Sequence, residues 1–135
     1  MRVLPFLLLL LILPARAQSD ETDVSLVQLI THPDHYHGKR VRLIGYMHLE
    51  FEGDALYMHR DDYAYVIYKN GLALELTSSQ RASAAKISDR YVTVEGTFNG
   101  KQGGYGGAFS GSIGGVTRLA DWSAAVKRLR QQQRK

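Results

Sequence analysis

The chain has 135 residues, no cysteine and a formal net charge of +4. Without cysteine there is no disulfide framework, no thiol nucleophile, no lipid-modified N-terminal cysteine and no c-type haem attachment, so stability has to come from an ordinary apolar core. The positive charge lies at one end, because residues 127–135 carry five bases whereas residues 18–126 carry 10 basic and 13 acidic residues. This body lacks the clustered Lys and Arg that bind phosphate backbones, so nucleic acid is not an expected partner.

The first 17 residues have the pattern of an export signal. A positive start at residues 1–2 precedes an apolar run from Val3 to Leu13, and Pro14 separates that run from Ala15-Arg16-Ala17. The run spans roughly 16 Å as a helix, too short for a hydrocarbon core of about 30 Å. Small residues at positions 15 and 17 suit a signal peptidase, so we predict cleavage after Ala17. The product is expected to be a periplasmic or secreted protein with no membrane span.

A polar leader at residues 18–22 and a short helix are the first elements expected after the signal. Asp23 is in position to cap that helix, and Val24 and Val27 share one of its faces. The helix is expected to end before Pro33 because proline disrupts a helix interior. A histidine-rich turn then leads into the first strand.

The clearest strand of the chain runs from Val41 to Glu52. Its odd positions hold apolar residues and Gly45, whereas its even positions are mostly polar, with Ile44 as the exception. This alternation is typical of a strand with one buried face. Twelve residues is long for a strand, and Gly45 is a natural point for a bulge or bend. We therefore expect the strand to coil around a barrel with its odd-numbered side chains inside.

Four further strands and a short helix are expected in the middle of the chain. In the second strand Leu56 and Met58 face inward, and Tyr57 and His59 face outward. Residues 60–62 are expected to form a connection. The later elements are a strand over 72–76, a serine-capped helix over 78–87, a strand over 91–98, a mobile loop with five glycines over 99–107, and a strand over 109–119.

The last predicted element is an amphipathic helix. Asp121 is in position to cap it, and Trp122, Val126 and Leu129 fall on one face at helical spacing. Its first two turns are expected to pack on the barrel. Residues 127–135 are assigned to a basic tail that frays into solvent. Contact of this tail with an anionic membrane surface or with lipopolysaccharide phosphates is the alternative.

Three stretches of the sequence carry a resemblance to a known fold: Gly38-Lys-Arg-Val-Arg-Leu-Ile-Gly45, Arg90-Tyr-Val-Thr-Val-Glu-Gly96 and the glycine-rich run from Phe109 to Leu119. In these stretches, and in the order of its elements, the chain resembles OB-fold proteins, and more narrowly small exported bacterial proteins with an OB-fold-like domain. The resemblance implies a mainly β domain over residues 23–126. That domain is a five-stranded Greek-key barrel with a short helix between strands three and four and a helix at each end. An SH3-like barrel is the nearest alternative. The shared motifs are structural and imply no catalytic residue.

OB-folds bind ligands on the outer face of their central strands and on the loops after the first and fourth strands. In this chain those positions hold Tyr46, His48, Tyr57, His59 and Tyr105. Flat rings suit sugars, peptides or bases, and export removes the chain from nucleic acid. We therefore predict a non-enzymatic module that binds a peptide, a glycan or a partner protein through an aromatic outer face. The alternative is that these tyrosines pack their rings on the barrel and expose only their hydroxyls to solvent.

Two other sites remain as alternatives. His32, His35 and His37 lie close together, and imidazoles bind Zn²⁺, Cu²⁺ and Ni²⁺ in metal-handling proteins of the periplasm, but the turn supplies no fixed fourth ligand. Glu50 and Glu52 lie on one side of the first strand, as the acid and base of a small hydrolase would. A polar turn and the solvated end of a strand are the favoured interpretations. No catalytic residue, metal or cofactor is therefore predicted.

Overall fold

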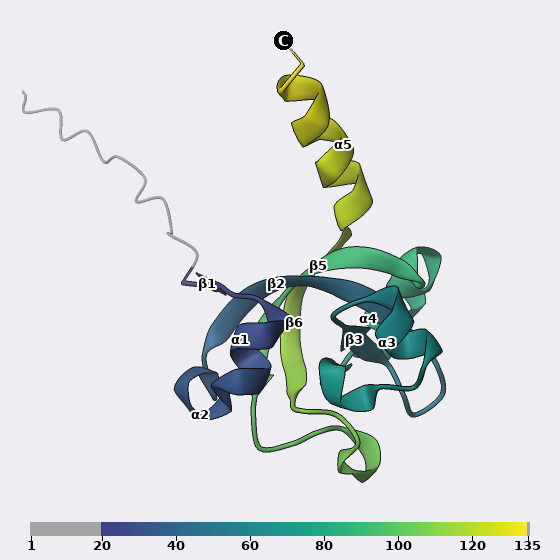
Figure 1. Cartoon of the computed structure of the whole chain (residues 1–135). Coiled ribbons are helices and arrows are strands. Elements are labelled where there is room, and N and C mark those ends of the chain that lie inside the picture. The colour runs from purple at the N-terminus through teal and green to yellow at the C-terminus, as the bar shows by residue number, and fades with distance from the viewer. Residues whose placement is uncertain (1–19, 135) are drawn as a thin grey trace, which may run out of the picture.

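The computed structural model describes residues 20–134. The predicted export signal at residues 1–17 lies outside the described residues. Among those that are described, no helix has both the length and the hydropathy needed to cross a bilayer. The described chain forms a β-barrel surrounded by short helices, with one longer helix, α5 (Trp122–Gln132), that projects away from it (Figure 1).

Five strands close into a mixed β-barrel: β2 (Arg40–His48), β3 (Ala55–Tyr57), β4 (Gly71–Leu74), β5 (Arg90–Asn99) and β6 (Ser112–Asp121). Neighbours pair in the order β2-β3-β4-β6-β5, and β5 pairs with β2 to close the barrel. Strands β4 and β6 run parallel, and the other barrel pairs are antiparallel. The prediction of a mainly β, five-stranded barrel is therefore confirmed.

Strand β2 has the predicted alternation in its middle. Leu43 and Met47 are buried in the barrel, whereas Ile44 between them is 41% exposed. Gly45 allows β2 to pass close to β3, because a Cβ at this position would lie 2.6 Å from Cγ of Leu56. The odd-numbered side chains of this stretch therefore form the inner face of the barrel.

The predicted extent of this first strand is wrong at its C-terminal end. Strand β2 ends at His48, which pairs with Ala55 of β3, and residues 51–53 form a turn. Phe51 consequently lies in solvent, 88% exposed, although the alternation placed it inside. Glu52 adopts a φ of +54°, which is incompatible with an extended strand. Residues 49–54 therefore form the loop between β2 and β3.

The barrel interior holds the main apolar core. Helix α1 (Leu26–Thr31) packs against it through Leu26 and Leu29, and α4 (Ser78–Ala84) through Ala84. Two further short elements, α2 (Pro33–Tyr36) and the 3-10 helix η2 (Ala85–Ile87), extend these helices. All five barrel strands contribute to the core, with Leu43, Met47, Leu56, Leu72, Val92, Val94, Phe98 and Ile113 among the fully buried side chains.

Both core-facing helices begin at capping boxes that differ from the predicted caps. Ser25, rather than Asp23, caps α1, because its hydroxyl accepts from the backbone N–H of Gln28 while the Gln28 side chain accepts from the N–H of Ser25. Thr77, rather than the serine after it, caps α4 in the same way with Gln80. In each box the Gln three residues after the N-cap accepts from the N–H of the N-cap residue. This second hydrogen bond favours Ser25 and Thr77 as the caps.

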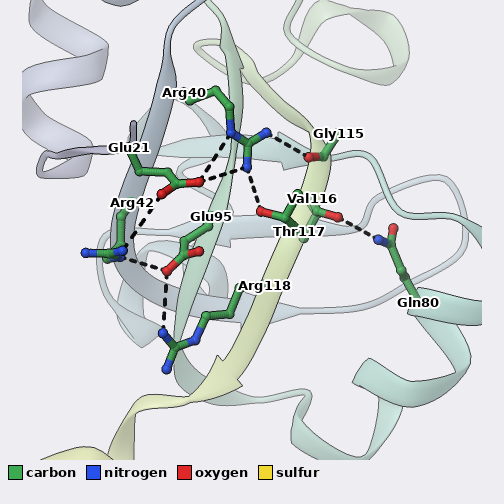
Figure 2. Close-up of polar contacts among 9 residues, drawn as sticks. All are labelled: Glu21, Arg40, Arg42, Gln80, Glu95, Gly115, Val116, Thr117 and Arg118. Atoms are coloured by element: carbon green, nitrogen blue, oxygen red, sulfur yellow. Dashed lines mark hydrogen bonds and ion pairs between the residues drawn. The ribbon is translucent and has the colours of Figure 1, made fainter. Parts of the chain in front are cut away.

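A two-residue strand, β1 (Thr22–Asp23), adds to the free edge of β2 as a parallel neighbour. Glu21 beside it accepts from Nη2 of Arg40 at 3.4 Å, and the same nitrogen donates to Oγ1 of Thr117 at 2.6 Å (Figure 2). The end of the predicted polar leader is thus bound to the barrel. Asp23 is part of this strand and is not available to cap α1.

Glu95 is buried on the outer side of β5 between two guanidinium groups (Figure 2). Its Oε1 lies 2.8 Å from Nε of Arg42 and 3.5 Å from Nη1 of Arg118. The hydrogen bond to Glu95 is the main reason that the pKa of Arg42 is raised. Nearby, Gln80 of α4 donates to the carbonyl of Val116 on β6 at 2.7 Å. The outer face of β2, β5 and β6 is therefore occupied by groups that neutralise one another.

The segment 59–70 covers the outer face of β2, β3 and β4, and is more than the connection predicted there. It contains α3 (Arg60–Ala64) and the 3-10 helix η1 (Tyr68–Asn70). Asp62 is buried and holds its two ends together, because it accepts from the N–H of His59 at 2.9 Å and from Nδ2 of Asn70 at 2.7 Å. Beneath this cover lies a second core cluster made of Tyr46, Ala55, Tyr57, Ala73 and Phe109, with Tyr63 packed against it.

The C-terminal helix α5 begins where the sequence predicts it. The side chain of Asp121 accepts from the N–H of Ser123 and caps the helix. Helical structure continues to Gln132, so the predicted fraying of the basic end is wrong over residues 127–132. None of the helix residues is buried, and Leu129 is 50% exposed. The expected packing of two turns on the barrel is therefore limited to half-buried side chains near the start of α5. The rest of the helix projects away from the barrel (Figure 1).

Candidate ligand-binding cleft

Two loops enclose a cleft of about 460 Å³ at one end of the barrel. One is the β2–β3 loop, residues 49–54, and the other is the β5–β6 loop, residues 100–111. Strand β4 and helix α4 complete the lining. These two loops follow the first and fourth strands of the barrel, where the sequence predicts the binding loops of an OB-fold. The chain therefore brings its two candidate binding loops together.

One exposed aromatic ring lines the cleft from each loop. Phe51 of the β2–β3 loop is 88% exposed, and Tyr105 of the β5–β6 loop is 74% exposed. Phe109 and Ala73, both buried, add apolar lining. Exposure of large apolar rings to solvent costs free energy in the folded state. Exposed rings that cluster at a concave surface are therefore typical of a binding site. The cleft therefore offers two flat apolar faces to a ligand.

The remaining lining of the cleft is acidic. It holds four carboxylates and the guanidinium of Arg81, a formal net charge of −3. Nε of Arg81 lies 2.9 Å from Oδ2 of Asp54 and neutralises that carboxylate. Among the described residues Glu52 and Glu75 have no cation within ion-pair distance, and Glu50 is near only His48, at 3.8 Å. Such a lining attracts positive charge and repels negative charge.

Backbone contacts give the glycine-rich β5–β6 loop, predicted to be mobile, a defined shape. It contains a 3-10 turn, η3 (Tyr105–Gly107). The N–H of Gly107 donates to the carbonyl of Gly104 at 3.1 Å, and Nζ of Lys69 donates to the carbonyl of Gly107 at 3.2 Å. Gly104 has a φ of +69°, and a Cβ there would lie 2.5 Å from Cβ of Ala73. Glycine is therefore required where the loop crosses β4 and presents Tyr105.

The five residues predicted to bind ligand do not form one surface. Tyr105 lines the cleft. Tyr46 and His48 line a different pocket, beside α3. His59 is exposed at the N-cap of α3 and belongs to neither group of lining residues. The aromatic outer face predicted from the strand pattern is therefore divided by the cover that residues 59–70 form.

Tyr57 is fully buried, and the prediction that it faces solvent is wrong. Its side chain leaves the outer side of β3 as the alternation requires, but the rings of Tyr63 and Phe109 pack on it at 5.7 and 5.9 Å between centroids. Burial raises the pKa of Tyr57 strongly. Tyr46 is 4% exposed for the same reason, since Tyr63 also stacks on its ring. These tyrosines pack on the barrel, which is the alternative that the sequence left open.

The pocket beside α3 contains a cluster of polar groups that satisfy one another. Nδ1 of His48 lies 2.6 Å from Oδ1 of Asp89, and the hydroxyl of Tyr46 donates to the same oxygen at 3.3 Å. The His48 ring stacks on Tyr63 at 3.9 Å. Burial, followed by the charge of Asp89, raises the pKa of Tyr46. Because these polar groups already bond one another, this pocket offers a ligand fewer free polar groups than the acidic cleft does.

The two alternative sites predicted from the sequence differ in their geometry. The imidazoles of the histidine-rich turn do not converge, since Nδ1 of His37 accepts from the N–H of Gly100 and His32 lies against Thr31. Among residues 20–134 no group of three or more His, Asp or Glu side chains is arranged to hold a metal ion. Glu50 and Glu52, in contrast, both line the acidic cleft.

The chain matches no protein-family model, and no curated protein or solved structure is significantly similar to it. Function is therefore inferred from the geometry of the cleft. Sequence reasoning missed Phe51 and Glu75 as cleft residues. The signal for Phe51 was available, because Glu52-Gly53-Asp54 has turn-forming composition and a turn that begins one residue earlier places Phe51 in solvent. Glu75 gave no such signal, since its place depends on the neighbouring loops.

Proposed function

We propose that this protein is an exported, non-enzymatic binding module that holds a basic peptide segment of a partner protein in the acidic cleft. We further propose that its barrel is a Greek-key OB-fold, which the strand order β2-β3-β4-β6-β5 and the parallel pairing of β4 with β6 support. The apolar segment at residues 3–13 supports export. The observation that carries the proposal is the pair of exposed rings beside unpaired carboxylates.

A basic peptide fits both parts of the cleft. The faces of Phe51 and Tyr105 accept apolar stems and attract cations through the negative charge of their π-systems. Glu52 and Glu75 supply charge that no described residue neutralises. A neutral glycan would use the rings but leave the net charge of −3 without compensation. An acidic ligand would be repelled, so charge selects a cationic ligand.

Fluorescence anisotropy with a labelled peptide tests this function. The probe is a short peptide of alternating Lys and Tyr, compared with the same peptide in which Gln replaces each Lys. We expect only the Lys peptide to bind, and more weakly as salt increases. Phe51→Ala and Tyr105→Ala should each lower its affinity about tenfold, as loss of a central aromatic contact does. The double variant Glu52→Gln/Glu75→Gln should also bind weakly, with a shallower salt dependence.

Two matched controls separate the cleft from general surface effects. Tyr65→Ala removes a ring that is 77% exposed but lies in the 59–70 cover. Asp20→Asn/Asp34→Asn removes two exposed carboxylates elsewhere. Both controls should bind the Lys peptide as the unchanged protein does. Equal binding of the Lys and Gln peptides, or unchanged binding by the cleft variants, would overturn the proposal.

A further inference from the structure

We propose that α5 is a second, independent binding surface, and that its partner is an anionic lipid membrane. In this arrangement the apolar stripe of α5 enters the membrane interface and its cations contact lipid phosphates. The proposal does not depend on the cleft. The helix leaves the barrel on the side away from the loop that contains η3 (Figure 1). A membrane bound to α5 would therefore leave the cleft accessible.

The described chain covers the apolar stripe of α5 only in part. Trp122, Val126 and Leu129 recur at the spacing of one helix face. Trp122 and Val126 are only half-buried, and Leu129 is 50% exposed. Tyr91 of β5 extends the stripe and forms, with Trp122 and Val126, part of a groove of about 520 Å³. Helix α5 thus projects from the barrel with an apolar face that the described chain leaves partly exposed.

Cations border this stripe and identify the partner by charge. Lys127, Arg130 and Arg134 line the groove beside Trp122, and Arg128 follows on the other side of the helix. Helix α5 contains no acidic residue. The described chain before it, residues 20–121, has 10 basic and 13 acidic residues. Net positive charge is therefore concentrated on the helix that projects away from the barrel, and an anionic surface would attract α5 while repelling the body.

A membrane fits this pattern better than an acidic protein surface. Helices that lie in a membrane interface combine an apolar stripe, Lys and Arg on the polar side and an aromatic residue such as Trp on the apolar side. Trp122, at the first position of α5, has the ring that favours the headgroup level. The acidic cleft of a second copy of this chain is the competing occupant. It would produce a head-to-tail assembly, so the experiment has to distinguish the two.

Vesicle binding tests the proposal with the chain that begins at Gln18. This chain contains every residue of both core clusters and omits the apolar run at residues 3–13, which would itself bind lipid. The probes are vesicles of equal parts phosphatidylcholine and phosphatidylglycerol, and vesicles of phosphatidylcholine alone. Trp122 is the single tryptophan of the chain, so its fluorescence reports directly on α5. We expect a blue shift and co-sedimentation with the anionic vesicles and neither with the neutral ones.

Variants of α5 measure the contribution of each part. Each cation removed near an anionic surface should lower partitioning about fivefold, so Lys127→Gln/Arg130→Gln should lower it about 25-fold. Leu129→Gln should lower it about tenfold by removing apolar contact. The matched control Lys86→Gln/Lys101→Gln removes two exposed cations from the body and should leave partitioning unchanged. Circular dichroism verifies that α5 remains helical in every variant.

Three results would overturn the proposal. The first is equal binding to both kinds of vesicle, or binding to neither. The second is a loss in the control as large as that in the α5 variants. The third is a dimer or larger assembly, detected by sedimentation without lipid, that the α5 variants and Glu52→Gln/Glu75→Gln both abolish. That last result would assign α5 to the cleft of a second copy instead of a membrane.

Discussion

The carboxylate of Asp121 accepts a hydrogen bond from the guanidinium of Arg90, with 2.8 Å between Oδ2 and Nη1. Its other oxygen accepts from the backbone N–H of Ser123 at 2.8 Å. The hydrogen bond from Arg90 is the main cause of the lowered pKa of Asp121. One side chain therefore starts α5 and also ties its first turn to β5. The orientation of the proposed membrane helix depends on this contact.

Asp121→Ala should destabilise the first turn of α5 by about 1 kcal/mol, the usual effect of losing an N-cap. Asp121→Asn keeps an oxygen that can accept from Ser123 and should have a smaller effect. Because the folded pKa of Asp121 is lowered, its contribution is present above its unfolded pKa of about 4 and is lost as pH falls through the folded value. Hydrogen exchange of the α5 amides measures both effects. Equal protection in all three proteins at every pH would contradict them.

Neighbouring residues on β2 test the assignment of its two faces. Leu43 is 1% exposed in the core, whereas Ile44 is 41% exposed. Leu43→Ala should lower the free energy of unfolding by about 2–5 kcal/mol, because it removes buried methyl groups and leaves a cavity. Ile44→Ala should lower it by less than about 1 kcal/mol. Urea denaturation compares the two, and equal losses would mean that β2 does not line a closed barrel.

The buried hydroxyl of Tyr57 should be dispensable for folding. It has no hydrogen-bond partner among the described residues. Tyr57→Phe removes this unsatisfied group and keeps the ring, so the free energy of unfolding should stay the same or increase by about 1 kcal/mol. Tyr46→Phe is the matched control, since it loses a hydrogen bond to Asp89 and should be destabilising. Thermal and urea denaturation provide the measurement. A large loss in Tyr57→Phe would show that the hydroxyl has a partner.

Substitutions at two glycines of the β5–β6 loop distinguish the cost of a left-handed backbone from the cost of a close contact with β4. Gly104 and Gly106 have φ values of +69° and +66°, but a Cβ would meet Ala73 only at Gly104. Alanine at either position costs about 1–2 kcal/mol for the left-handed backbone. Gly104→Ala should cost about 1–3 kcal/mol more, because the loop must move away from β4. It should also weaken peptide binding by displacing Tyr105, and identical behaviour of the two variants would refute the close contact.

Short-range patterns in the sequence predicted those parts of the fold that depend on near neighbours. The alternation around Leu43 and Met47 predicted the inner face of β2, because side chains of an extended strand must point to opposite sides. Asp121 was correctly predicted to cap α5, since an N-cap needs only a short acceptor and the free N–H groups that follow it. The cap of α1 was predicted two residues too early, because Gln28 reaches back to Ser25 and not to Asp23.

The sequence by itself determined a mainly β barrel, the face that each β2 side chain takes and the start of α5, because helix and strand periodicities are local properties of the chain. Only the tertiary structure decided which outward tyrosines meet water. Tyr57 is buried by the 59–70 cover, whose place depends on the contact between Asp62 and Asn70. The tertiary structure also creates the cleft, since Phe51 and Tyr105 are far apart in sequence. They lie together only because barrel closure brings their loops to the same end.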